Sequence, residues 1–131
     1  MMSSKSASRI LVALCAVAAS SVAAPATAAS QAAFNGTWSV LIMTDEGPCD
    51  RAYRYPMKVT NGRVSYAGQA DFSLSGQVAP NGAVRVTVSR GDSRASGSGR
   101  LFGRSGSGSW RGAGSQSACS GSWTAEKRGE G

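Results

Sequence analysis

Few side chains in this sequence are suited to catalysis. Its 131 residues include no histidine, which excludes a Ser-His-Asp or Cys-His arrangement and a metal site built on imidazole. Asp45, Glu46 and Asp50 lie close together beside Cys49, but their spacing matches no calcium-binding loop and is typical of a solvated turn. We therefore expect a protein that is not an enzyme, with no catalytic residue, no bound metal and no cofactor.

Aromatic side chains are the better candidates for a binding site. A small β-barrel can hold one small molecule, and aromatic residues on several strands would line such a cavity. The same residues would serve equally well as a hydrophobic core, so both interpretations stay open. Were the ligand haem, its axial ligand would have to be Tyr or Met. The candidate ligand-binding residues are Trp38, Tyr53, Tyr55, Trp110 and Trp123.

A short motif between two expected strands suggests adhesion. Arg90, Gly91 and Asp92, followed by Ser93, resemble the integrin-recognition loop of adhesion proteins, in which a hairpin presents Arg and Asp together. Gly-Asp is also ordinary turn chemistry, which needs no binding role. The sequence leaves both interpretations open.

The N-terminal segment predicts export. Lys5 and Arg9 precede an apolar stretch, residues 10–19, that is too short to span a bilayer. Small residues follow, with an A-x-A cleavage site at Ala26-Thr27-Ala28. This order is that of a signal peptide, so we expect residues 1–28 to be removed. Residues 29–131 then form one domain, secreted or periplasmic, with no transmembrane segment.

The cysteines fit an oxidising compartment. Cys15 lies within the predicted signal peptide, which leaves Cys49 and Cys119 in the mature chain. An even number of cysteines in a small exported domain predicts a disulfide. On the chain-entropy model, closing a loop of this length contributes about 4 kcal/mol of stability.

The mature chain is basic. The signal peptide carries two of the 14 basic residues and none of the seven acids, so the remaining net charge is +5. Ten of the twelve remaining basic residues are Arg. Arg-rich faces favour anionic partners, and we expect envelope or extracellular polymers rather than nucleic acid. A basic surface that only keeps the protein soluble is the alternative.

Period-two alternation of apolar and polar residues predicts an all-β fold. Asn61-Gly62 separates two alternating runs and is a strong hairpin signal. Pro56 lies inside one run, which predicts an edge or bulge there. The expected architecture is a small antiparallel up-and-down barrel, or a barrel-like sandwich. The eight expected strands are Gly36–Met43, Arg51–Thr60, Arg63–Ala67, Asp71–Val78, Ala83–Ser89, Arg94–Phe102, Ser105–Arg111 and Ala118–Glu126.

The Gly- and Ser-rich C-terminal half is predicted to form strands rather than a linker. Two of its segments, Gly108-Ser109-Trp110 and Gly121-Ser122-Trp123, repeat the pattern of Gly36-Thr37-Trp38. Gly and Trp two residues apart share one face of a strand. Inward glycines then leave room for an aromatic ring from a neighbouring strand, as in tightly curved sheets.

Two resemblances bear on function. Gly36-Thr37-Trp38 at the start of a meander of about eight strands resembles the calycin superfamily of lipocalins and avidins, which implies a barrel with an internal ligand. The segments FNGTWSVLIMTDEGPCDRAYRYP, VSRGDSRASGSGR and CSGSWTAE are similar to small exported bacterial proteins of unknown function. Some of these carry a haem-utilisation or adhesion label, which implies extracellular binding.

Three functions follow as expectations. The first is a non-enzymatic binding or adhesion domain that acts outside the cytoplasm. The second is a calycin-like carrier of a small hydrophobic ligand or haem. The third is a periplasmic protease inhibitor that presents the loop Thr44–Asp50 to an active site.

Overall fold

The computed structural model describes residues 32–114 and 117–130. The predicted signal peptide, residues 1–28, lies outside the described residues. No helix among the described residues is long and apolar enough to cross a membrane.

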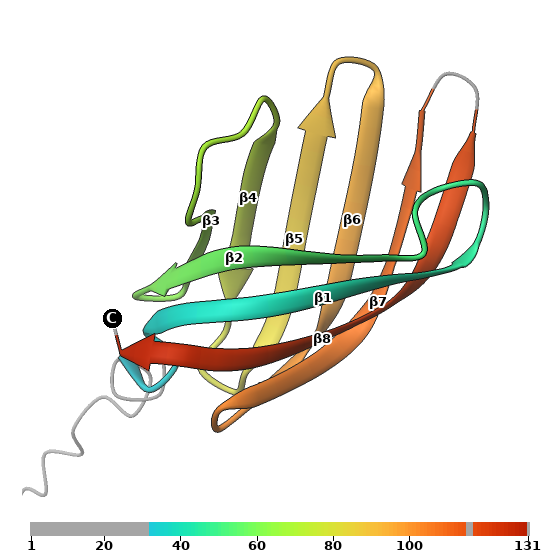
Figure 1. Ribbon diagram of the computed structural model, residues 1–131. Helices are drawn as coiled ribbons and strands as arrows, with labels where there is room; N and C mark the ends of the chain where they lie inside the picture. Colours follow the sequence, from blue (N-terminus) through green and yellow to red (C-terminus); the bar gives the residue numbers. More distant parts are fainter. Residues whose placement is uncertain (1–31, 115–116, 131) are drawn as a thin grey trace, which may run out of the picture.

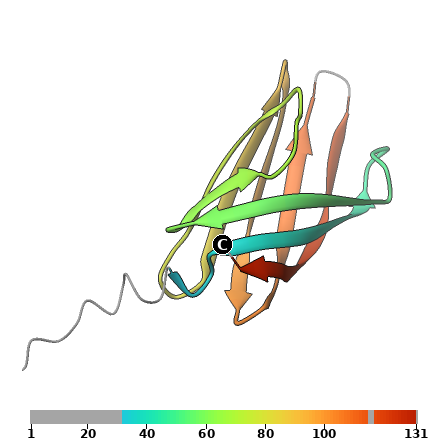
Figure 2. The same ribbon diagram turned by 60° about the vertical axis from the view of Figure 1, so that its left-hand side comes forward.

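Eight antiparallel strands close into a barrel, which confirms the predicted fold class (Figures 1 and 2). Each strand pairs with the next one in the chain, and β1 also pairs with β8. The strands are β1 (Gly36–Glu46), β2 (Ala52–Thr60), β3 (Arg63–Tyr66), β4 (Ser73–Val78), β5 (Ala83–Arg90), β6 (Ser93–Phe102), β7 (Ser105–Ala113) and β8 (Ala118–Glu130). The Gly- and Ser-rich half therefore supplies three of the eight strands, as predicted.

The turn between β2 and β3 is the predicted two-residue hairpin. Thr60 pairs with Arg63, and the intervening Asn61 and Gly62 have φ angles of 49° and 81°. Positive φ at both central positions is what the favoured hairpin turn requires, and Asn-Gly adopts it at the lowest cost. The backbone N–H of Asn61 also donates to the side-chain oxygen of Asn35 at 2.7 Å, which fixes the chain just before β1.

β2 has no register partner in β3 toward the open end, and Pro56 lies at the boundary, where its carbonyl still accepts from the Ala67 N–H at 3.0 Å. Pro56 pairs with Ser39 of β1 without a bulge. On its other side β3 ends at Tyr66, which pairs with Met57. β3 and β4 share only two register pairs, so the sheet splays apart beyond them. Proline tolerates such a position because it has no N–H to donate to a neighbouring strand.

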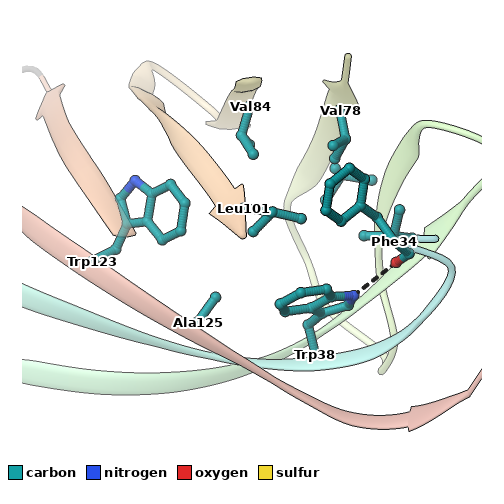
Figure 3. Packing of buried hydrophobic residues seen from close by; sticks show 9 residues of the cluster. Phe34, Trp38, Val78, Val84, Leu101, Trp123 and Ala125 are labelled. Atoms are coloured by element: carbon teal, nitrogen blue, oxygen red, sulfur yellow. Dashed lines mark hydrogen bonds between the residues drawn. The ribbon is translucent and has the colours of Figure 1, made fainter. Parts of the chain in front are cut away.

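One end of the barrel is filled with apolar side chains; we call it the closed end. It is the end at which β1 begins and β8 finishes. Phe34 lies across it from just before β1, and Trp38 and Leu101 point toward it from the barrel wall (Figure 3). The buried core residues are Phe34, Trp38, Val59, Val64, Val78, Val84, Leu101, Trp123 and Ala125.

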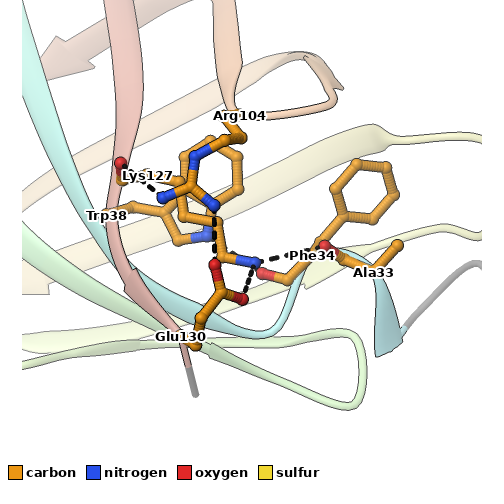
Figure 4. Close-up of polar contacts among 6 residues, drawn as sticks. All are labelled: Ala33, Phe34, Trp38, Arg104, Lys127 and Glu130. Carbon is orange, nitrogen blue, oxygen red and sulfur yellow. Dashed lines mark hydrogen bonds and ion pairs between the residues drawn. The ribbon is translucent and has the colours of Figure 1, made fainter.

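A polar cluster fastens Phe34 to the closed end (Figure 4). The Trp38 indole N–H donates to the carbonyl of Phe34 at 2.9 Å. The Lys127 side chain is 5% exposed, and its Nζ donates to the Ala33 carbonyl at 3.4 Å and to Glu130 at 2.9 Å. Arg104 donates to the other Glu130 oxygen at 2.6 Å. The charge of Lys127 is thereby paired where its stem packs against apolar surface.

The opposite end, at which β1 finishes and β2 begins, is the open end. Cys49 in the β1–β2 loop is bonded to Cys119 near the start of β8, which confirms the predicted disulfide. The bond joins two segments that are 70 residues apart in the sequence. It therefore ties the loop between the first two strands to the last strand.

Candidate functional site

The half of the barrel next to the open end contains an apolar cavity of about 370 Å³. All eight strands contribute side chains to its wall. The aliphatic residues at its centre are only half-buried, because no side chain from the opposite wall covers them. These residues are Val40, Ile42, Leu74, Val86 and Val88. The barrel is thus packed at one end and hollow at the other.

Small inward residues on β6 help to keep this half hollow. Ala95 and Gly97 of β6 line the cavity. A methyl group added at Gly97 would meet its neighbours only at ordinary contact distances of 3.6–3.8 Å. Ala95 and Gly97 pair with Val88 and Val86 of β5, so neither valine is covered by a large side chain from the neighbouring strand. Nothing at these positions of β6 projects far toward the tyrosines of β2 across the interior.

Two Trp side chains at the cavity wall lie opposite glycines of a neighbouring strand. β7 and β8 pair so that Gly108 lies opposite Trp123 and Trp110 lies opposite Gly121. A Cβ at Gly108 would lie 2.6 Å from the Trp123 indole, so only glycine leaves room for that ring. This confirms the predicted use of inward glycines.

Both of these indoles are anchored by hydrogen bonds across a strand. The Trp123 N–H donates to the carbonyl of Ser98 on β6 at 3.2 Å. The Trp110 N–H donates to the carbonyl of Met43 on β1 at 2.9 Å. Each N–H is therefore satisfied inside the barrel wall, and the rings present apolar surface to the cavity.

Four aromatic rings gather where the sheet splays between β3 and β4. Ring centroids are 5.0 Å apart for Tyr66 and Phe72 and 6.3 Å apart for Tyr55 and Phe72. Tyr53 continues the cluster toward the open end, 5.8 Å from Tyr55, and its hydroxyl donates to Asp50. The rings meet edge to face or tilted, which suits their quadrupoles. Three of them, Tyr53, Tyr55 and Phe72, line the cavity where β3 is too short to do so.

Within this cluster, the hydroxyl of Tyr55 has a raised pKa. Partial burial raises its pKa above the usual 10.0, and the neighbouring Tyr66 and Asp50 raise it further. All three causes disfavour the phenolate. The Tyr55 hydroxyl therefore stays protonated at neutral pH and is a hydrogen-bond donor beside the cavity.

Arg90 brings a charge to the rim of the cavity. It follows Val84, Val86 and Val88 in the inward-facing positions of β5 and lines the cavity as they do. Its guanidinium pairs with Asp71 at 2.9 Å, and both side chains are largely exposed. An exposed pair of this kind contributes at most about 1 kcal/mol and exchanges readily with solvent or ligand.

The tripeptide Arg90-Gly91-Asp92 spans the end of β5 and the turn to β6. Arg90 pairs with Ser93 across the turn, and Gly91 has φ of 56°. Arg90 lines the cavity and is engaged by Asp71, whereas Asp92 lies in the exposed turn. The two charged side chains of the motif thus have different surroundings.

All five predicted ligand-binding residues line the cavity, at different depths. Trp38, 2% exposed, and Trp123, 7% exposed, lie toward its floor. Tyr55 and Trp110 are half-buried in its wall, and Tyr53 is 44% exposed near the opening. Sequence reasoning missed the aliphatic wall and Arg90. Strand alternation alone would have placed Arg90 on the same face as Val84, Val86 and Val88.

The acidic residues noted in the sequence lie at the open end. Asp45 and Glu46 finish β1, and Asp50 accepts from the Tyr53 hydroxyl while its carbonyl accepts from Thr44 at 2.7 Å. Within the described residues, no group of three or more His, Cys, Asp or Glu is arranged to hold a metal ion.

Searches of protein-family models, curated proteins and solved structures find no match to this chain.

Proposed function

We propose that this protein is a non-enzymatic binding protein that carries a small apolar molecule in the open half of its barrel. The observation that supports the proposal is the cavity of about 370 Å³, lined by half-buried aliphatic and aromatic side chains. Ligand pockets of proteins typically have volumes of about 300–1,000 Å³ and mainly apolar walls with a few polar groups.

The volume sets the size of the ligand. An engineered apolar cavity of about 150 Å³ binds benzene, so the present cavity has room for roughly 15 non-hydrogen atoms. Haem is much larger and would not fit inside. A ligand with one flat or branched apolar body and at most one polar group suits the wall best.

The placement of polar groups sets the orientation of the ligand. Trp38 and Trp123 form an apolar floor, and the Tyr53 and Tyr55 hydroxyls and Arg90 lie nearer the opening. An apolar body directed toward the floor would gain about 25 cal/mol for each Å² removed from water. A polar group directed outward would avoid the cost of burying it without a partner. Export of the chain, as its N-terminal segment predicts, would put this activity outside the cytoplasm.

A fluorescent ligand tests the proposal. N-phenylnaphthylamine is neutral, apolar and of the right size, and its emission rises in apolar surroundings. We expect saturable binding of one molecule per chain, with quenching of Trp emission. Val86→Trp, which fills the cavity from β5, should weaken binding at least about tenfold, since the new ring occupies the ligand's place. Val88→Trp fills the cavity nearer its opening and serves as a second variant.

Thr87→Trp is the matched control. Thr87 lies between the two valines on β5 but is exposed on the outer face, so the same indole is added outside the barrel. It should bind the probe like the wild type. The proposal is wrong if the folded wild-type protein does not bind the probe, or if Val86→Trp and Val88→Trp bind it as tightly as Thr87→Trp.

A further inference from the structure

The acidic residues are excluded from six consecutive strands. β2 to β7 contain eight basic residues and no Asp or Glu. All seven acids of the chain lie elsewhere, namely Asp45 and Glu46 at the end of β1, Asp50, Asp71 and Asp92 in loops, and Glu126 and Glu130 on β8. Seven of the eight basic residues face outward; Arg90, which lines the cavity, is the exception.

Four of these outward arginines lie together on β5, β6 and β7. Arg85 of β5 lies opposite Ser98, diagonal to Arg100 of β6. Arg94 of β6 is likewise diagonal to Arg111 of β7, which lies opposite Ser96. Diagonal neighbours on paired strands are about 7–8 Å apart, so the arginines form two close pairs. Arg94 and Arg100 are six residues apart on one strand, which separates the pairs by about 20 Å.

A band of hydroxyl groups fills the space between the two arginine pairs. We call the whole surface the arginine face. It consists of Arg85, Thr87, Arg94, Ser96, Ser98, Arg100, Ser107, Ser109 and Arg111, all exposed. Register places them in adjacent rows, with Thr87 opposite Ser96, Ser98 opposite Ser109 and Arg100 opposite Ser107.

The donors of the arginine face are not engaged within the barrel. None of its four guanidinium groups forms an ion pair with another of the described residues. Glu46 is the acid in the same row as Arg111, but Ser120 of β8 lies between them. An open depression of about 550 Å³ adjoins this end of the face and is lined by Arg94, Ser96 and Arg111, with Glu46 of β1 on its wall as well.

We propose that the arginine face binds an acidic polysaccharide whose anionic groups are carboxylates, that is, a chain of uronic acids. Arginine pairs with carboxylates through two parallel hydrogen bonds, and the geometry is specific. Serine and threonine hydroxyls both donate and accept, as sugar hydroxyls do. A face about 20 Å long, with cations at both ends and hydroxyls between, matches a polymer that alternates carboxylates with neutral hydroxyls.

Two other anionic polymers fit the face less well. Single-stranded nucleic acid is usually held by several aromatic side chains on which bases stack, and the large exposed aromatic residue beside the face is Phe102 alone. A lipid surface is normally bound by several apolar side chains that enter the headgroup region together with basic ones, whereas Phe102 is a single such side chain, beside the face rather than within it. The uronate polymer needs only the charges and hydroxyls that the face offers.

Affinity electrophoresis and calorimetry with polygalacturonate test the proposal at about 0.15 M salt, where weak long-range attraction is screened. We expect wild-type protein to bind, with affinity that falls as salt rises. The double variant Arg94→Gln/Arg111→Gln should bind at least about tenfold more weakly, since it removes two charge-assisted contacts. Arg85→Gln/Arg100→Gln should show a similar loss from the other end of the face.

Arg54→Gln/Arg63→Gln is the matched control, with the same change of net charge on β2 and β3, across the barrel from β6 and β7 (Figure 1). Its affinity should change less than about threefold. Equal losses in the control and in the face variants would overturn the proposal, as would tighter binding of single-stranded DNA or of phosphatidylglycerol vesicles than of polygalacturonate. Probe binding in the cavity should be unchanged in every variant, so this proposal and the carrier function can fail separately.

Discussion

The closed end and the open half of the barrel use the same strands and the same inward alternation, but they differ in packing. At the closed end the inward side chains of Trp38 and Val78 are each 2% exposed. In the open half Val86 and Val88, two and four residues beyond the buried Val84 on β5, are half-buried. A residue that faces inward is therefore not necessarily a core residue in this protein.

The difference has two physical causes. The closed end receives Phe34 from outside the sheet, and the Trp38 indole and Lys127 hold the backbone before β1 in place. The open half has no such plug among the described residues, and its β6 wall carries Ala95 and Gly97. Close packing stabilises the first region, whereas the second leaves apolar surface for a ligand to cover.

Trp38→Ala should produce the largest loss of stability. Removing a fully buried indole costs about 3–5 kcal/mol because it removes apolar burial and leaves a cavity. The Phe34 carbonyl also loses its donor. Urea unfolding of the protein with its disulfide intact measures the free energy. Tyr53→Ala, at an aromatic residue that is 44% exposed in the open half, is the control and should cost less than about 1 kcal/mol. Similar losses in the two variants would contradict the distinction between the ends.

Removing the disulfide should weaken the open end first. Cys49→Ala/Cys119→Ala opens a loop of 70 residues, and the chain-entropy model gives a loss of up to about 4 kcal/mol. Because the bond ties the β1–β2 loop to β8, hydrogen exchange should accelerate at the open end of β1, β2 and β8. Amides near Trp38 and Val78 should keep most of their protection. Uniform acceleration at both ends would show that the barrel opens as one unit.

Val78→Ala and Val88→Ala make the same chemical change in the two regions. Val78 is buried at the closed end, so we expect its truncation to cost about 2 kcal/mol from lost burial and a new cavity. Val88 faces the existing cavity, so its truncation should cost less than about 1 kcal/mol. Guanidinium unfolding measures both. If Val88→Ala were as costly as Val78→Ala, the Val88 side chain would have to be closely packed in solution. The open half would then not be hollow.

Alternation and turn chemistry were enough to predict the strands and their order. The inward face of β5, for example, follows from Val84, Val86 and Val88 alone, and Asn61-Gly62 fixes the register of β2 with β3. The paired cysteines likewise predicted the bond between Cys49 and Cys119. These signals are local or rest on composition, and a sequence carries them directly.

The cavity could not be predicted in the same way. Periodicity tells which side of a strand faces inward, but not how far the opposite wall lies, so Val84 and Val86 look alike in the sequence. The match of Gly108 with Trp123 and of Trp110 with Gly121 depends on the register of β7 with β8, which no turn motif fixes. The plug by Phe34 is a contact between a segment before the sheet and the barrel interior, and no pattern marks it.

The smallest predicted effect concerns the polar cluster that fastens the plug at the closed end. Hydrogen bonds from Lys127 and Arg104 hold the pKa of Glu130 below its usual 4.5. The folded state therefore binds this proton less readily than the unfolded chain does. The stabilisation is present above about pH 5 and is lost as the pH falls below 4.5 through the lowered pKa. Glu130→Gln should flatten the dependence of the unfolding midpoint on pH in this acid range and leave the midpoint near pH 7 slightly lower.

Glu126→Gln is the control for this titration. It removes a carboxylate from the same strand, but this carboxylate pairs with Arg128 and not with Lys127. It should retain the part of the acid dependence that comes from Glu130. Thermal unfolding between about pH 3 and pH 7 compares the three proteins. Because Lys127 also donates to the Ala33 carbonyl, Glu130→Gln should loosen the plug. Amide exchange at Asn35, whose N–H donates to the Ala32 carbonyl, should rise more than at Val86. A rise confined to the open half would mean that the cluster does not hold the closed end together.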